Sequence, residues 1–115
     1  MGIELNILAD IALNIIFENV SLKYALERLD AVNVKVLLVV NSKEAFVAAL
    51  TDGDVRRAIL AGASLETPIS RIANYNPIYL EKEDLHQARV YLEQITAVPV
   101  VDADKRISRV YVREA

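Results

Sequence analysis

A threonine, two aspartates and two arginines lie close together in the segment ALTDGDVRRAIL, residues 49–60. An apolar run gives way to a helical pattern here, and Thr51 and Asp54 are three residues apart at that corner. The first N–H groups of a helix are unpaired and carry partial positive charge, which suits a phosphate. Thr51 can add a hydroxyl donor, and the Asp54 carboxylate can accept hydrogen bonds from both hydroxyls of a ribose. The simpler alternative is that Thr51 and Asp52 only cap the helix.

Two further interpretations concern the same corner. Asp52 and Asp54 form a D-x-D pair, which is found in divalent-metal sites, but their side chains diverge by about 200° on a helix. No other acidic cluster is aimed at this corner, so we expect no metal. Arg57, one turn after Asp54, is a better phosphate ligand than Arg56, because neighbouring residues diverge on a helix. A solvated Arg57 is the alternative.

Composition excludes several classes of function. The chain has 115 residues, 54% of them hydrophobic, which is enough for one compact domain. A net charge of −3 gives no electrostatic footprint for nucleic acid or for an anionic membrane. There is no cysteine, and the single histidine, His86, argues against a Ser/His/Asp triad. Because no apolar run is long enough to span a bilayer and no signal peptide is evident, we expect a cytoplasmic protein.

The first part of the chain is predicted to form a helix, two antiparallel strands and a second helix. Their ranges are 21–32, 35–40, 45–50 and 53–61. Ser21 is a good N-cap for the first helix, and Gly62 is a stop signal for the second. The valine-rich run before the turn is typical of a buried strand.

The second part repeats this order. Asp84 is predicted to cap a helix, VPVVD (98–102) matches LLVVN (37–41), and ISRVYV (107–112) matches the second strand of the first unit. The offset is about 62 residues. Internal duplication determines architecture more strongly than any single motif does. We expect the two units to pack their sheets together about a pseudo-twofold axis.

The predicted organisation has three parts. These are a leading helix and short strand (1–17), a first repeat (18–72) and a truncated second repeat (73–115), joined through a linker and a leading strand within 64–80. The chain stops at Ala115, where the first unit would begin its last helix. We expect a piece of a longer protein, and a lost helix is the alternative.

Three short motifs accompany the duplication. They are the strand entry Pro77-Ile78-Tyr79, the PVVD strand beginning at Pro99, and the T-x-x-D of Thr51 and Asp54. Over residues 15–115 this pattern resembles tandem cystathionine-β-synthase (CBS) domains, a Bateman module. The resemblance implies an α+β fold of two β-α-β-β-α repeats, the second lacking its last helix. TDGDVRRAILAGASLETPI further resembles the CBS pairs attached to sugar-phosphate nucleotidyltransferases.

The resemblance also implies a function. CBS pairs bind AMP, ADP, ATP or sometimes S-adenosylmethionine between the repeats, commonly form homodimers and regulate a linked enzyme or transporter. It places Ile78 and Tyr79 against adenine, Asp54 on ribose, and Lys35 with its repeat partner Thr96 near phosphate. The alternatives are core packing for Ile78, core or edge contacts for Tyr79, and a solvated strand end for Lys35.

The second cleft departs from the pattern. Aligning the strands sets Val112 against Thr51 and Ala115 against Asp54, so both the hydroxyl and the carboxylate are missing. If ligand binds, we expect one site to dominate, built around Asp54.

Two other classes of function compete with a ligand-binding regulator. A ligand-free dimerisation or scaffolding module would use the Val-, Ile- and Leu-rich helix faces. A stand-alone enzyme has little support, because the sequence has no evident nucleophile–base pair and no glycine-rich phosphate loop. We therefore expect no catalytic residues and no required cofactor in this chain.

Overall fold

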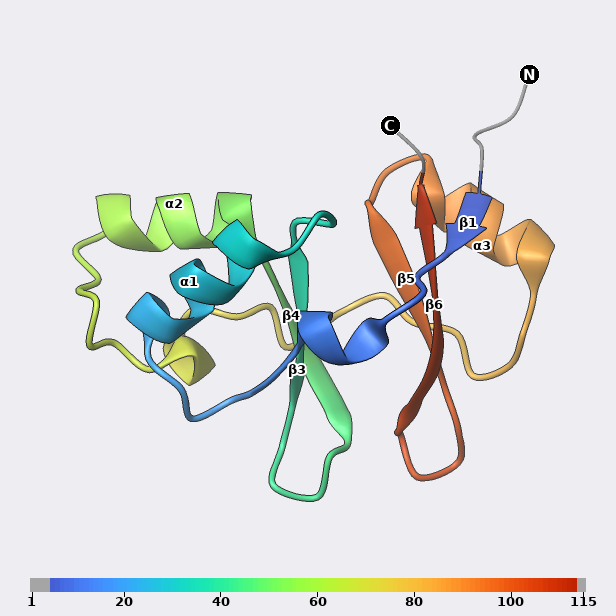
Figure 1. Cartoon of the computed structure of the whole chain (residues 1–115), viewed down its shortest axis with the longest axis horizontal. Coiled ribbons are helices and arrows are strands. Elements are labelled where there is room, and N and C mark those ends of the chain that lie inside the picture. The colour runs from blue at the N-terminus through green and yellow to red at the C-terminus, as the bar shows by residue number, and fades with distance from the viewer. Residues whose placement is uncertain (1–4, 114–115) are drawn as a thin grey trace.

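Buried, valine-rich strands form the centre of the molecule. The computed structural model describes residues 5–113. In it, β3 (Val36–Val40) and β5 (Ala97–Val101) are buried at every position, as expected of apolar runs covered on both faces. Each belongs to a three-stranded sheet, and the two sheets lie side by side with the longer helices on their outer sides (Figure 1).

The two sheets define two halves. The first half has the strand order β2-β3-β4, with β2 (Ile15–Phe17) parallel and β4 (Phe46–Thr51) antiparallel to β3. The second half has the order β1-β6-β5, in which β6 (Ile107–Arg113) is antiparallel to both neighbours. β1 (Leu5–Ile7), which comes first in the chain, therefore completes the sheet of the second half and ties the two halves together.

The predicted duplication is confirmed at the level of strand register. Val36 pairs with Thr51 in the first half, and Ala97 pairs with Val112 in the second, each 61 residues further along the chain. The pairing shifts after Val39 in one half and after its counterpart Val100 in the other. The fold is thus α+β with two repeats about a pseudo-twofold axis, as predicted.

The hairpin turns repeat in the same way. The Asn41 side-chain oxygen accepts hydrogen bonds from the N–H groups two and four residues further on, and the Asp102 carboxylate does the same. Glu44 and Lys105, at equivalent places in these turns, both have a φ of 64°. Side-chain bonding of this kind stabilises a tight turn locally.

The predicted helices are present with their predicted caps. They are α1 (Leu22–Ala31), α2 (Asp52–Leu60) and α3 (Leu85–Leu92). Ser21 accepts the N–H of Tyr24 at the start of α1, and Asp84 accepts the N–H of Gln87 at the start of α3. Gly62, with a φ of 105°, follows the end of α2. No helix among residues 5–113 is long and apolar enough to cross a membrane.

The predicted leading helix is wrong for the part of it that the structure describes. Residues 5–17 form β1, a short 3-10 helix η1 (Ile11–Asn14) and β2. The short strand predicted within residues 1–17 is confirmed as β2. The predicted helix does not form because β6 and β3 offer strand pairing to this segment, and tertiary pairing outweighs local propensity. Residues 2–4 of the predicted helix lie outside the described residues.

The leading strand predicted for the second repeat is reduced to isolated bridges. Leu80 pairs in parallel with Val100, and antiparallel bridges join Asn74 to Ala49 and Pro68 to Ser21. Pro68 and Pro77 supply no N–H to a ladder, so this connection carries only a short 3-10 helix, η2 (Ile69–Arg71).

Candidate functional site

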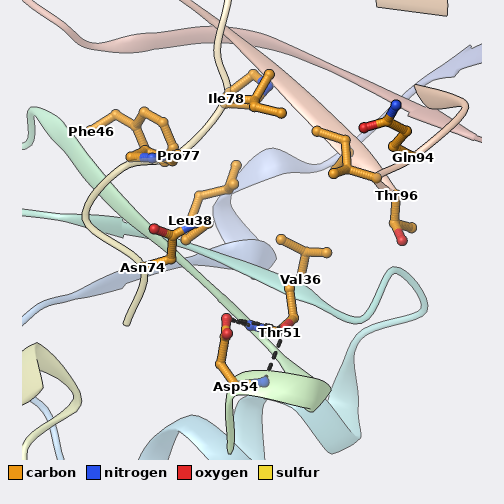
Figure 2. A pocket seen from close by; sticks show the side chains of 14 residues that line it. Val36, Leu38, Phe46, Thr51, Asp54, Asn74, Pro77, Ile78, Gln94 and Thr96 are labelled. Carbon is orange, nitrogen blue, oxygen red and sulfur yellow. Dashed lines mark hydrogen bonds between the residues drawn. The ribbon is translucent and has the colours of Figure 1, made fainter. Parts of the chain in front are cut away.

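A cavity of about 240 Å³ lies between the two halves. Its wall is mainly apolar, with a few polar side chains, which is typical of sites for small molecules. Thr51 and Asp54 lie at one end and Ile78 at the other, with Asn74 and Thr96 on opposite sides (Figure 2). The lining residues are Val36, Leu38, Phe46, Ala49, Thr51, Asp54, Asn74, Pro77, Ile78, Gln94, Ile95, Thr96, Ala97 and Pro99.

Thr51 and Asp54 bond to one another at the start of α2. The Thr51 hydroxyl accepts the N–H of Asp54 at 3.2 Å. Asp54 Oδ2 in turn accepts the N–H of Thr51 at 3.0 Å and its hydroxyl at 3.1 Å. This reciprocal arrangement is a capping box. The T-x-x-D spacing carries that signal in the sequence. The simpler alternative, that Thr51 and Asp52 cap the helix, is confirmed for Thr51, and the second residue of the cap is Asp54 rather than Asp52.

The other oxygen of Asp54 keeps binding capacity. Oδ1 accepts a hydrogen bond from Arg57 Nη2 at 2.9 Å. A carboxylate oxygen has two lone pairs, so Oδ1 can accept one more donor. The Arg57 side chain is 72% exposed, against 19% for Asp54, and an ion pair so open to solvent holds its partners weakly. Asp54 is therefore both a cap and an available acceptor at the cavity.

Arg57 reaches Asp54 by lying along the first turn of α2. A Cβ placed on Gly53 would come within 3.2 Å of Arg57 Nη1. Because glycine has no side chain, the guanidinium can lie against the helix at this point. Arg57 does not line the cavity; it lines a neighbouring hollow of about 370 Å³ that has Asp54 in common with the cavity.

Ile78 and Thr96 line the cavity, but Tyr79 lies elsewhere. The Tyr79 ring packs edge-on against Phe46, with the ring centres 6.3 Å apart. The Lys105 ammonium lies 4.2 Å from the centre of the same ring. Phe46 and Lys105 belong to hairpins of different halves, so Tyr79 contacts both halves. These are the core and edge contacts named above as the alternative for Tyr79.

Lys35 also lies outside the lining. Its ammonium donates to the carbonyls of Leu29 and Val32 at 2.8 and 2.7 Å. These carbonyls are at the end of α1, where a cation is favourable. Arg113 does the same at the end of α3, donating to Leu92 O at 3.0 Å. A phosphate contact by Lys35 stays a prediction, and its ammonium is already engaged.

Three polar residues of this region were not predicted. Asn74 and Gln94 line the cavity, and Arg71 lines the neighbouring hollow. No local signal marks Asn74 or Arg71, because they belong to an irregular connection that only the fold brings beside α2. Gln94 is two residues before Thr96, so the predicted role of Thr96 was the sequence feature that pointed toward Gln94.

The corresponding corner of the second half is covered. Val112 stands at the position of Thr51 and packs with Leu8 and Ile11 in the core between the sheets. The amide of Asn14, which is only 4% exposed, donates to Val34 O at 2.9 Å and to Val36 O at 2.8 Å. These bonds hold η1 over this side of the core. Ala115, the counterpart of Asp54, lies outside the described residues.

No metal centre is evident in the part of the chain that the structure describes. Residues 5–113 contain no group of three or more His, Cys, Asp or Glu side chains that could hold an ion.

Comparison with known proteins gives a fold and a distant relative. No protein-family model matches the chain. An uncharacterized protein of Helicobacter pylori (strain J99) is 33% identical over 96 residues, which is 82% of this chain but only 29% of the relative. The chain thus spans less than a third of that protein.

The similar solved structures include CBS-domain proteins. A CBS domain protein from Streptococcus pneumoniae has a TM-score of 0.76 at 16% identity, covering 96% of this chain and 77% of that one. One from Pyrobaculum aerophilum, complexed with AMP, has a TM-score of 0.71 at 22% identity, covering 82% and 75%. The cytosolic domain of the Mg²⁺ channel MgtE, complexed with ATP, has a TM-score of 0.69 at 20% identity, covering 85% and 41%. The chain has the fold of a CBS-domain pair.

Proposed function

We propose that this chain is a regulatory module that binds an adenosine nucleotide, AMP, ADP or ATP, in the cavity between its halves. The observation that carries the proposal is the cavity itself, which places Asp54 and Thr51 of the first half opposite Ile78 and Thr96. The same fold holds AMP in the Pyrobaculum protein and ATP in the MgtE domain, which supports this ligand class.

The lining suits the parts of such a ligand. Asp54 Oδ1 accepts a ribose hydroxyl in addition to Arg57, or in its place. The apolar side chains of Leu38, Ile78 and Pro99 offer a surface for the base, and apolar walls with few polar groups give both affinity and orientation. The amides of Asn74 and Gln94 can pair with the polar edge of the base.

Binding between the halves offers a route to regulation. A ligand that touches both halves favours the relative position in which both sets of contacts form, and this difference in affinity between two states is what allosteric control requires. We propose that a catalytic domain in the same or an associated protein receives the signal, and that the module itself is not catalytic. Three more specific predictions go with this proposal: a homodimer, a cytoplasmic location, and a sugar-phosphate nucleotidyltransferase as the linked enzyme. The prediction of a nucleotidyltransferase rests on residues 51–69 alone.

Titration calorimetry with AMP, ADP and ATP tests the nucleotide proposal, using Asp54→Asn as the variant. We expect nucleotide affinity to fall about tenfold or more, since a hydrogen bond to a charged acceptor is lost. Asp52→Asn is the matched control, because it removes the same charge from the same turn but lines a groove on another face of α2. Unfolding of each variant without ligand separates lost capping from lost binding. Absence of nucleotide binding by the wild-type chain would refute the proposal.

A ligand-free dimerisation module is the second candidate. Leu60 is 81% exposed on α2, beside Ile59 and a groove that runs between α1 and α2. Exposed apolar side chains grouped in this way are typical of an interaction surface. Light scattering on Leu60→Lys tests this, with Val90→Lys on α3 as the control. A nucleotide-independent dimer that only Leu60→Lys dissociates, together with failed nucleotide titrations, would favour this candidate.

A further inference from the structure

The hollow beside the cavity continues it past Asp54. One wall is the flank of α2, with Asp54, Arg57 and three small residues of α2 and its end. The other wall is the connection after η2, with Arg71 and Ile72. Asn74 of the same connection lines the cavity, so Asp54 and this connection border both spaces. The alanines that complete the hollow, Ala58, Ala61 and Ala63, leave a volume of about 370 Å³.

The charges of this hollow are unbalanced. Two guanidinium groups line it, those of Arg57 and Arg71, against the single carboxylate of Asp54. The Arg57 guanidinium bonds to Asp54, whereas the Arg71 side chain has no hydrogen bond or ion pair with any other described residue. Planar guanidinium groups bind phosphate oxygens in pairs, and two of them flanking one hollow suit a group with several such oxygens.

We propose that this hollow is the subsite for the phosphate groups of the nucleotide, and that Arg71 is the residue by which the module prefers a phosphorylated nucleoside to adenosine. The inference rests on the proposed function, because it takes Asp54 as the ribose acceptor. Phosphate in the hollow attracts both guanidinium groups, and Arg57 then exchanges Asp54 for phosphate. That exchange frees Oδ1 of Asp54 for the ribose hydroxyls. Phosphate binding and ribose binding therefore support each other through Arg57.

Calorimetry with adenosine, AMP and ADP on the wild-type chain and on Arg71→Gln tests the subsite. We expect Arg71→Gln to lower the affinity for ADP about tenfold or more and to leave the affinity for adenosine unchanged. The wild-type affinity for ADP falls with added salt, and the fall is smaller in Arg71→Gln. Arg56→Gln is the matched control, since this arginine lies in the groove between α1 and α2, and it should leave every affinity unchanged.

Pyrophosphate separates the subsite from the nucleotide proposal. We expect millimolar pyrophosphate to raise the melting temperature of the wild-type chain and of Arg56→Gln, but not that of Arg71→Gln. The subsite is overturned if the wild-type chain binds adenosine and ADP with equal affinity, or if Arg71→Gln and Arg56→Gln lower the affinity for ADP equally. Either result leaves the proposed function intact. A response to pyrophosphate without any nucleotide binding overturns the proposed function instead. No response to pyrophosphate or to any nucleotide overturns both.

Discussion

The two halves differ where their last strands end, although their hairpins match bond for bond. In the first half, β4 passes through Thr51 into α2, and a cavity lies beside that corner. In the second half, Val112 occupies the same register and pairs with Asn6 of β1, while Leu8 and Ile11 pack against the core cluster that contains it. Equal backbone register therefore does not give equal sites. The segment that crosses each corner determines whether it is open or covered.

The two crossing segments begin alike and then diverge. Asn74 bonds to Ala49 of β4, and Leu8 donates to Val110 of β6 at the equivalent position. After this point the first segment contains Pro77 and lies along the cavity wall. The other turns into η1 and is held by the buried amide of Asn14. The covered corner is the one beside a connection that a buried amide fixes to the core.

Replacing the two asparagines should therefore have very different effects. Asn14→Ala leaves the carbonyls of Val34 and Val36 without their donor, so we expect a loss of about 2–4 kcal/mol in the free energy of unfolding. Asn74→Ala removes only an exposed bond to the N–H of Asn76 and should cost less than about 0.5 kcal/mol. Urea unfolding measures both. Similar losses in the two variants would contradict the contrast between a buried and an exposed asparagine side chain.

The capping box gives the next largest effect. Thr51→Ala removes the acceptor for the N–H of Asp54 and the hydroxyl donor to its carboxylate, and should cost about 1 kcal/mol. Thr51→Ser keeps the hydroxyl and should restore most of this stability. Thermal unfolding measures the change, with an expected shift of about 5 °C for Thr51→Ala. An unchanged melting temperature would mean that the box contributes nothing and that the motif serves ligand alone.

The paired hairpin turns give a smaller effect. Glu44 and Lys105 share a φ of 64°, which is unfavourable for a residue with a side chain. Glu44→Gly should stabilise the protein by about 0.5 kcal/mol, because it relieves this strain at some cost in chain entropy. Lys105→Gly should be nearly neutral, since it also removes the cation from the Tyr79 ring. Equal gains by urea unfolding would show that the Tyr79 contact adds no stability.

The smallest effect is a pH dependence carried by the connection. Partial burial, followed by the hydrogen bond to Glu18, raises the pKa of Tyr75 from 10.0 to about 12. The folded pKa lies above the unfolded one, so this contribution to stability is complete below pH 10 and is lost as the pH rises toward 12. Ultraviolet titration of the tyrosines follows it, and Tyr75→Phe should remove the late-titrating group. Titration of Tyr75 near pH 10 would show that the Glu18 bond does not form.

Local signals account for much of the fold. Ser21, Asp84 and Gly62 are where capping chemistry puts them, because a cap depends on residues within one turn of the helix. The duplicated strands follow from their apolar runs and matched turns. The leading segment was assigned wrongly, because Leu5–Ile7 takes its partners from β6, more than 100 residues away. Periodicity cannot reveal a strand that is made by distant pairing.

The residues of the candidate site likewise fall into those predicted from local signals and those that only the fold brings together. The sequence by itself determined the caps, the repeat and the T-x-x-D corner, since each depends on neighbours in the chain or on a copy of the same pattern. Only the tertiary structure decided that Asn74, Gln94 and Arg71 stand beside that corner, that Lys35 is engaged by carbonyls, and that η1 covers the second corner. The physical reason is that irregular connections have no period of their own. The surfaces against which they pack determine where their side chains lie.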